Sequence, residues 1–174
     1  MKKLLLTLLL LICLSFINSV NANYNDGWVA YQKGDYATAL KEWLPLAEKG
    51  EVSPQQNLGV MYRLGQGVNQ DYRKALRWYR KAAEQGHPDA IYSIATMYTL
   101  GDGVEQDFKE AINWHTKGAE KEIAGSQFSL GIFYVFGKGV PQSYEKAAYW
   151  INLAREQKYE EAEKVWNAFE LWKY

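Results

Sequence analysis

NLGVMYRLGQGVNQDYRKALRWYRKAAEQG, residues 57–86, contains two helical patterns joined by a loop with two glycines. The second helix is predicted to begin after Asp71, because an aspartate side chain accepts hydrogen bonds from the free amides of a first helical turn. Gly65 and Gly67 follow the first helix, where glycine adopts the left-handed conformation without a steric cost. Residues at helical spacing form the apolar face of the second helix: Ala75, Trp78, Tyr79, Ala82 and Ala83. The stretch therefore predicts a helix hairpin.

The same pattern returns every 36 residues along the chain. The helix-starting residue recurs as Asp35, Asp71, Asp107 and Ser143, and the aromatic residue after it as Tyr36, Tyr72, Phe108 and Tyr144. The glycine pair recurs as Gly65/Gly67, Gly101/Gly103 and Gly137/Gly139. A single hairpin cannot bury its own apolar face, so hairpins repeated at a fixed period stack on their neighbours. The period predicts an all-α fold, an α-solenoid of stacked helix hairpins.

The period also predicts the domain organisation. We expect one solenoid domain over residues 23–174, with a starting hairpin at 24–50, repeats at 51–86, 87–122 and 123–158, and a capping helix at 159–174. The capping helix is expected to run from Tyr159 to about Trp172, with Ala162, Trp166 and Phe169 packed against the last repeat.

Local signals predict further details. Pro45 indicates a kink or an early stop in the second helix of the starting hairpin. Ser53 followed by Pro54 favours a helix that starts at Pro54. Small residues recur in the middle of the first helices, where glycine is normally unfavourable, so we expect the two helices of a hairpin to cross closely there: Gly59, Ala95 and Gly131.

The N-terminus has the pattern of a signal peptide. Lys2 and Lys3 precede an apolar run over residues 4–17, and Val20-Asn21-Ala22 is a small-residue cleavage pattern, so we predict a signal peptide at 1–22 cut after Ala22. A transmembrane anchor is disfavoured because the run is shorter than the roughly 20 residues that span a bilayer. Lipid attachment is disfavoured because bulky Leu and Ile precede Cys13. The prediction is a periplasmic or secreted protein whose mature chain does not insert into a membrane.

The composition excludes several classes of function. The whole chain has 20 basic and 20 acidic residues, and loss of Lys2 and Lys3 with the leader leaves a net charge of about −2. This charge favours neither nucleic acid nor an anionic membrane as a partner. Cys13 is the single cysteine, so the mature chain has no disulfide and no thiol chemistry. We expect it to be monomeric when free.

Residues 57–62 (NLGVMY), 65–68 (GQGV) and 71–87 (DYRKALRWYRKAAEQGH) resemble the Sel-1-like repeat family, and the resemblance extends over about residues 28–158. A tetratricopeptide array would have a period of about 34 residues instead. The resemblance implies a curved right-handed α/α superhelix whose concave face, built by the first helices of the repeats, holds peptides or protein partners. The expected function is therefore an interaction scaffold or adaptor for an unidentified protein or peptide.

The family also includes proteins that neutralise secreted lipase toxins, so an immunity protein is a narrower alternative. It further includes cysteine-rich members reported to bind penicillin, which carry a disulfide in each repeat. The absence of cysteine from the mature chain separates it from that branch. A weak β-lactamase or peptidoglycan-active enzyme is the alternative from another class.

Catalytic and metal-binding patterns have simpler explanations. Ser143 and Lys146 match a serine-x-x-lysine motif, but Ser143 occupies the helix-starting position of the repeat. His87 and His115 have no acidic or sulfur partner at metal-ligand spacing, and His115 replaces Tyr79 and Ile151 of the other repeats, so we expect it to be packed. The glycine pairs lack the strand and the lysine-serine signature of a phosphate-binding loop. We predict no enzymatic activity, no metal and no cofactor.

One apolar stripe is a candidate partner-binding surface. Its members recur toward the ends of the first helices: Val60, Leu64, Thr96, Leu100, Ile132 and Phe136. If they lie on one face, they form a groove suited to an amphipathic helix or a hydrophobic peptide. The alternative is that Leu64, Leu100 and Phe136 only close the helix ends against the valine that follows each glycine pair.

Overall fold

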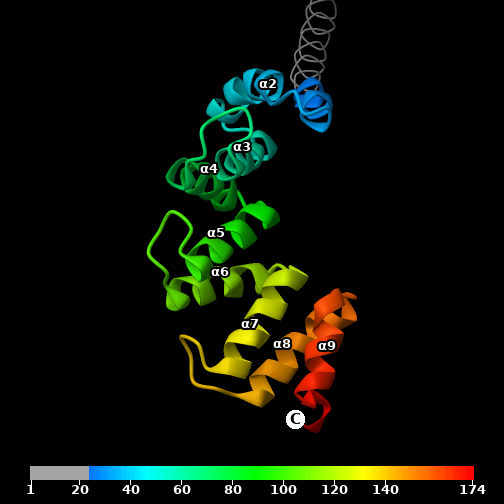
Figure 1. The fold of residues 1–174 in the computed structure, drawn as a ribbon. Coiled ribbons are helices and arrows are strands. Elements are labelled where there is room, and N and C mark those ends of the chain that lie inside the picture. Colours follow the sequence, from blue (N-terminus) through cyan, green and yellow to red (C-terminus); the bar gives the residue numbers. More distant parts are fainter. Residues whose placement is uncertain (1–23) are drawn as a thin grey trace, which may run out of the picture. The chain divides into compact units, whose positions relative to one another are not determined.

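The computed structural model describes residues 24–174, so the predicted signal peptide and its cut after Ala22 lie outside the described residues. Within this range all regular structure is helical, and consecutive helices form hairpins (Figure 1). The predicted fold class, an all-α solenoid, is confirmed. None of the helices among residues 24–174 is both long enough and apolar enough to cross a bilayer.

The helices follow the 36-residue period. Residues 24–32 are helical, and α2 (Tyr36–Glu48) completes the starting hairpin. The first helices of the three repeats are α3 (Val52–Leu64), α5 (Pro88–Leu100) and α7 (Ala124–Phe136), and their second helices are α4 (Tyr72–Glu84), α6 (Phe108–Glu120) and α8 (Tyr144–Glu156). The chain ends with α9 (Glu160–Ala168) and the short 3-10 helix η1 (Leu171–Lys173).

The predicted helix starts are confirmed for α2 and α4. The Asp35 carboxylate accepts a hydrogen bond from the Thr38 amide at 3.1 Å, and Asp71 accepts one from the Lys74 amide at 2.9 Å. Hydrogen bonds from the Thr38 side chain and then from its amide lower the pKa of the Asp35 carboxyl. The bond from the Lys74 amide is the largest cause of the lowered pKa of Asp71. Both carboxylates thus satisfy amides that have no partner within their helix.

The starts of α6 and α8 follow the same rule. Asp107 accepts from the amides of Lys109 at 2.8 Å and Glu110 at 3.1 Å. The Ser143 hydroxyl accepts from the Lys146 amide at 3.3 Å. The serine therefore performs the task that an aspartate performs in the other repeats.

Glycine ends the first helices as predicted. Gly65, Gly101 and Gly137 adopt the left-handed conformation, with φ values of 70°, 81° and 63°, and each donates its amide to a carbonyl four residues earlier. The second glycine of the loop has a further role that the pattern did not reveal. A Cβ on Gly139 would lie 2.8 Å from Cβ of Phe108, so this glycine lets the loop contact the start of the preceding second helix.

A repeated glutamine, which the motif above did not include, closes the same loops. Its side-chain amide donates to a backbone carbonyl seven residues earlier in each of three loops: Gln70 to Arg63 at 2.9 Å, Gln106 to Thr99 at 2.7 Å and Gln142 to Val135 at 2.7 Å. The 36-residue spacing of these glutamines in the sequence could have indicated that they share a structural role.

The described chain forms two compact units, residues up to 78 and residues 79–174, with the boundary inside α4. The first unit is centred on Trp43, which is fully buried among the rings of Tyr24, Trp28 and Tyr31. Its indole nitrogen donates to the Tyr24 carbonyl at 3.1 Å. Because this nitrogen has a partner, burial of the whole indole leaves no polar atom of that side chain unsatisfied.

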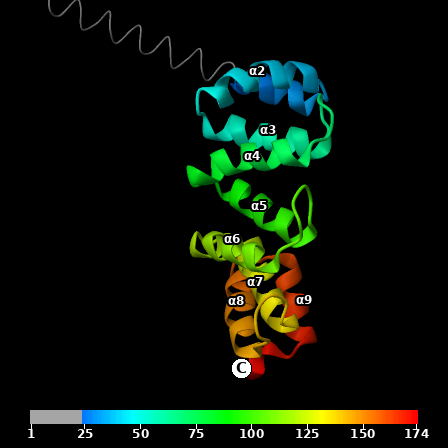
Figure 2. The ribbon, with the colours of Figure 1, turned by 90° about the vertical axis from the view of Figure 1, so that its left-hand side faces the viewer.

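In the second unit, α7 packs against α8, and α8 packs against α9 (Figure 2). The close crossing predicted at Gly131 is confirmed, since a Cβ there would lie 2.5 Å from Cδ1 of Ile151 on α8. At the C-terminal end, Ala162 is fully buried, and Trp166 and Phe169 pack against the same core as predicted.

Three local predictions differ from the structure, wholly or in part. The first helix of repeat 51–86 begins at Val52 after Glu51, two residues before the predicted start, and Ser53 is not its cap. The early stop at Pro45 does not occur, because α2 continues to Glu48.

The third concerns the capping helix, which ends at Ala168 and not near Trp172. The chain then turns at Glu170, which has a φ of 51°, and η1 places Leu171 in the core. The cap of the solenoid is therefore a helix followed by a tight return of the chain.

Candidate partner-binding groove

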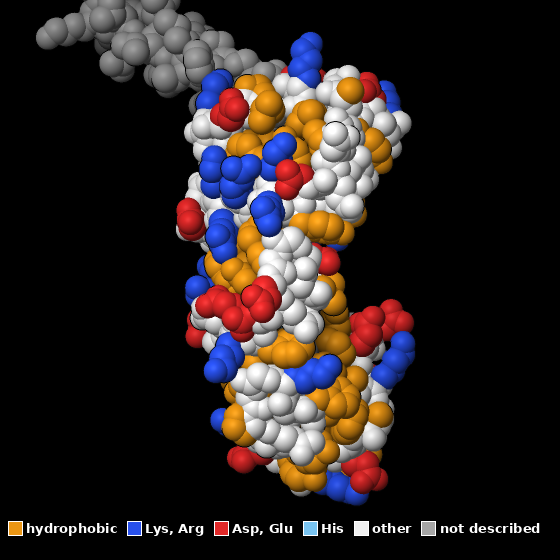
Figure 3. All heavy atoms as spheres, turned by 60° about the vertical axis from the view of Figure 1, so that its left-hand side comes forward, with side chains coloured by type: hydrophobic (Ala, Val, Ile, Leu, Met, Phe, Trp, Pro, Cys, Tyr) orange, Lys and Arg blue, Asp and Glu red, His pale blue; other side chains and the backbone are white. Residues whose placement is uncertain are grey.

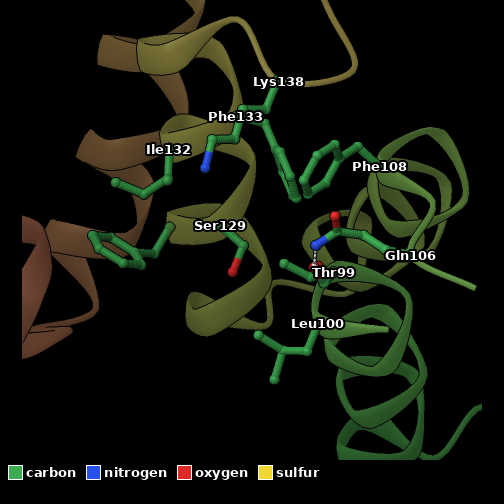
Figure 4. A pocket seen from close by; sticks show the side chains of 9 residues that line it. Thr99, Leu100, Gln106, Phe108, Ser129, Ile132, Phe133 and Lys138 are labelled. Carbon is green, nitrogen blue, oxygen red and sulfur yellow. Dashed lines mark hydrogen bonds between the residues drawn. The ribbon is translucent and has the colours of Figure 1, made fainter. Parts of the chain in front are cut away.

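A cavity of about 330 Å³ opens between the end of α5 and the middle of α7, within the second unit (Figure 4). We call it the Leu100 groove. Nine residues line it: Thr99, Leu100, Gln106, Phe108, Phe128, Ser129, Ile132, Phe133 and Lys138. They come from α5, the loop after it, α6, α7 and the next glycine loop. The repeat therefore brings together residues that are far apart in the sequence.

Apolar side chains form most of the groove wall. The rings of Phe108 and Phe133 meet edge to face, with 5.9 Å between their centroids. The ring of Phe128 packs against the ring of Tyr159, with 5.0 Å between their centroids. Burial is the main cause that raises the pKa of Tyr159 to about 12. Each phenylalanine of the groove wall therefore packs against another aromatic ring, which holds the wall in place.

The neutral polar groups at the groove already have partners. The Gln106 amide donates to the Thr99 carbonyl, as Figure 4 shows, and the Ser129 hydroxyl donates to the Gly125 carbonyl at 2.8 Å. Lys138 is the single charged residue among the nine that line the groove. Its ammonium lies 5.8 Å from the centroid of the Phe108 ring. The groove is thus an apolar surface with one cation at its edge.

Three of the predicted site residues lie in or beside the groove. Leu100 and Ile132 line it, and Leu100 is 62% exposed. Phe136 is 55% exposed and packs edge to face on Phe169, with 5.7 Å between centroids. Side chains that only closed helix ends would be covered, so these exposures favour an open apolar surface.

The other three predicted residues do not line the Leu100 groove. Thr96 on α5 is half-buried, and its hydroxyl donates to the Tyr92 carbonyl at 3.0 Å. Val60 and Leu64 lie on α3 in the first unit, where Val60 is half-buried and Leu64 is 47% exposed.

Sequence reasoning missed three important groove residues, Phe108, Phe128 and Lys138. Phe128 lies one helical turn before Ile132, and the aromatic residue Tyr92 lies 36 residues before Phe128. The repeated aromatic residue at this position could therefore have indicated Phe128. The sequence identifies Phe108 only as a repeated aromatic. Lys138 lies in a glycine loop, and the sequence pattern does not indicate that this loop reaches the groove.

Figure 3 shows one face of the molecule with its side chains coloured by type. Hydrophobic side chains are exposed in both the upper and the lower half of this view, and charged side chains lie between them. Exposed apolar area of this kind is typical of interaction surfaces.

His115 packs against Phe133, one of the residues that line the groove. It is buried, as predicted, and its ring lies 5.9 Å from the ring of Phe133 and 5.7 Å from that of Tyr92. Its Nδ1 lies 3.5 Å from the Ser126 hydroxyl oxygen. Burial lowers the pKa of His115 from 6.5 to about 4, because the charged imidazolium loses its hydration.

This pKa shift makes the stability of the fold depend on pH. The unfolded chain takes up a proton near pH 6.5, whereas the folded chain does not until about pH 4, so stability is full above pH 6.5 and falls as the pH drops toward 4. Between pH 7 and pH 5 we expect His115 to cost about 2 kcal/mol. Urea unfolding of the chain and of His115→Ile at both pH values measures this loss. An equal pH dependence in both proteins would contradict the assignment.

The serine-x-x-lysine motif has a structural role. Ser143 caps α8, as predicted, and the Lys146 ammonium lies 5.3 Å from the centroid of the Tyr134 ring. Across residues 24–174, no group of three or more His, Cys, Asp or Glu side chains could hold a metal ion.

Known structures resemble this fold. The Sel1 repeat protein from Oxalobacter formigenes matches with a TM-score of 0.71 and 30% identity, over 77% of this chain and 53% of that chain. A protective antigen present in uropathogenic Escherichia coli strains, described as displaying an SLR fold, matches with a TM-score of 0.75 and 36% identity, over 79% of this chain and 30% of that chain. The chain thus spans about half and about a third of the lengths of these two proteins.

The Helicobacter pylori cysteine rich protein B shares the fold alone, with a TM-score of 0.59 and 20% identity over 75% of this chain and 94% of that chain. No curated protein matches the chain in sequence. The model of the Sel1 repeat matches residues 55–87, 88–122 and 124–159, which together make up more than half of the chain. These matches coincide with the helix pairs α3 and α4, α5 and α6, and α7 and α8, and the chain belongs to the Sel1 repeat family.

Proposed function

We propose that this chain is an exported scaffold that binds a protein partner through the first helices of its repeats. The Leu100 groove and the neighbouring Phe136 form the centre of the proposed surface. Ile132 is part of the groove, and Thr96 of the same unit is also assigned to this surface. Val60 and Leu64 are proposed as further partner-binding residues within the first unit. Export through a signal peptide at residues 1–22, to the periplasm or beyond it, is part of the same proposal.

The observation that carries this proposal is the exposure of large apolar side chains beside a preformed cavity. Leu100 and Phe136 are both more than half exposed, although each lies on a helix whose opposite face is buried. Leaving such groups in water costs about 25 cal/mol for each Å² of apolar surface, and a partner that covers them recovers this free energy. Pockets that receive a partner's anchor residue are typical centres of binding energy.

The family supports the same function. Sel1 repeats generally serve as protein–protein interaction scaffolds, and stacked hairpins suit this role because their surface residues vary while the buried positions repeat. Binding of a partner needs no catalytic group, and the conspicuous candidate, Ser143, is used as a helix cap.

The proposal is tested with Leu100→Asp and Phe136→Asp, each of which places a charge where the partner would bury an apolar side chain. The matched control is Tyr149→Asp, because Tyr149 is an aromatic residue on α8 that is 59% exposed and does not line the groove. Affinity capture from an extract of the cell envelope, with quantitative mass spectrometry, identifies proteins retained by the unaltered chain.

We expect a partner that is retained by the unaltered chain and by Tyr149→Asp and is bound at least about tenfold more weakly by the two groove variants. Circular dichroism should show unchanged helix content for all three variants. If Leu100→Asp and Phe136→Asp retained the partner as well as the unaltered chain does, this surface would be excluded as the binding site.

A further inference from the structure

We propose that the Leu100 groove selects a partner segment in which a large apolar side chain is accompanied by a carboxylate, and that Lys138 binds this carboxylate. This inference rests on the proposed function, since it names the chemistry of the partner at the same surface.

The first support is the position of Lys138. In Figure 4 its side chain extends over the groove, and its ammonium points toward Ile132. Among residues 24–174, no carboxylate lies within 4.0 Å of this ammonium, whereas Lys74 and Lys164 each form an ion pair with an acidic residue close to them in the sequence. The cation at the groove is therefore available to a ligand.

The equivalent position in the first glycine loop has a different role. Gln66 holds the position equivalent to Lys138, and it is used within the fold: its side-chain oxygen accepts from the Tyr31 hydroxyl at 2.7 Å and its amide donates to the Tyr36 hydroxyl at 3.2 Å. The Lys138 ammonium lies instead over the face of Phe108. In the first loop, the residue at this position forms hydrogen bonds within the fold. In the third loop, Lys138 instead places a positive charge beside the apolar wall of the groove.

The second support is the chemistry of the wall. The eight other residues that line the groove are uncharged, and five of them are large and apolar: Leu100, Phe108, Phe128, Ile132 and Phe133. Lys138 is exposed, so a ligand can reach its ammonium, and hydrogen bonds between charged groups are roughly twice as strong as neutral ones. A carboxylate next to the apolar anchor is the group that this arrangement favours.

The surroundings favour a protein segment over a small amphiphilic anion as the occupant. The cavity volume of about 330 Å³ is at the lower end of the range of roughly 300–1,000 Å³ found for small-ligand sites. The apolar surface also continues outside the cavity, at the exposed part of Leu100 and at Phe136. A peptide can place one anchor in the groove and cover these neighbours at the same time.

The test is selection from a phage-displayed library of random dodecapeptides on the full chain, on Lys138→Glu and on Leu100→Asp. We expect the unaltered chain to enrich peptides with Leu, Ile or Phe close in sequence to Asp or Glu, and Lys138→Glu to enrich Lys or Arg in place of the acid. A selected peptide should bind about tenfold more weakly to Lys138→Met, or when its acid is changed to the amide, and this difference should shrink at high salt.

The outcomes separate this inference from the proposed function. Apolar peptides without an acidic preference would overturn the role of Lys138 and leave the binding surface in place. Identical selections on the unaltered chain and on Leu100→Asp would overturn both. If the unaltered chain enriches no peptide but binds laurate, the groove holds an amphiphilic anion and the inference is wrong.

Discussion

Trp43→Ala is expected to lower the free energy of unfolding by about 4 kcal/mol, a large part of the stability of a domain of this size. The indole is fully buried in α2 and touches the rings of Tyr24 and Tyr31, at centroid distances of 6.1 and 5.5 Å. Its removal leaves a cavity beside Leu58 and Met61 and leaves the Tyr24 carbonyl without its donor. Urea unfolding followed by circular dichroism measures the change.

The control is Trp172→Ala, which removes a tryptophan that is 54% exposed. Its loss should cost about 1 kcal/mol or less, because an exposed site leaves no enclosed cavity. Equal effects of the two substitutions would show that the centre of the first unit lies elsewhere.

Gly131→Val is expected to cost about 3 kcal/mol, although valine is otherwise a better helix residue than glycine. The new Cβ would lie 2.5 Å from Cδ1 of Ile151 and 3.3 Å from the Ala147 carbonyl oxygen, so α7 and α8 would have to move apart. Their separation would expose part of the core that contains Val135 and Ala148. Thermal and urea unfolding both report this loss.

A double-mutant cycle with Ile151→Ala tests the cause. Ile151 is fully buried, so its truncation alone should cost about 3 kcal/mol. The truncation also frees the space that a valine at position 131 needs, and the double variant should therefore be at least about 1 kcal/mol more stable than the sum of the single effects predicts. Additive effects would show that the strain at Gly131 comes from another contact.

Local signals predicted those parts of the fold that depend on neighbouring residues alone. A helix start needs one side-chain oxygen close in sequence to a free amide, and all four predicted caps make this bond. A left-handed helix end needs a residue without a Cβ, and the predicted glycines have the corresponding φ values. Both interactions lie within one turn of helix, so the sequence is enough to predict them.

The proline signal at the start of α3 failed because the repeat register outweighed it. Pro54 lies in the third helical position, where its missing amide costs little since the first-turn amides have no partner within the helix. The helix could therefore start at Val52, in register with Pro88 and Ala124 of the next repeats.

The early stop predicted at Pro45 in α2 does not occur because of packing. Buried Trp43 and Leu46 lie on either side of Pro45 in the sequence, and their burial favours continuing the helix through it. The stability of a helix in a folded chain comes mostly from its packed face, so a local preference against one residue was overcome.

The C-terminal end shows the same limit. The pattern identified Ala162 and Phe169 as packed residues, but it did not predict that the chain turns at Glu170 and returns Leu171 to the core. This turn uses a positive φ at a residue other than glycine, which no local preference favours. The contact of Leu171 with the core compensates for it.

The sequence by itself determined the all-helical class, the 36-residue hairpin, the capped starts of the second helices and the glycine ends of the first helices, because periodicity and capping act over short stretches of chain. It also identified Leu100, Ile132 and Phe136 as candidates, since their spacing follows the repeat. Only the tertiary structure decided that Leu100 and Ile132 share a cavity with Phe128 and Lys138. The physical reason is that a cavity arises where neighbouring hairpins fail to fill the space between them, and this depends on side chains that come from different repeats.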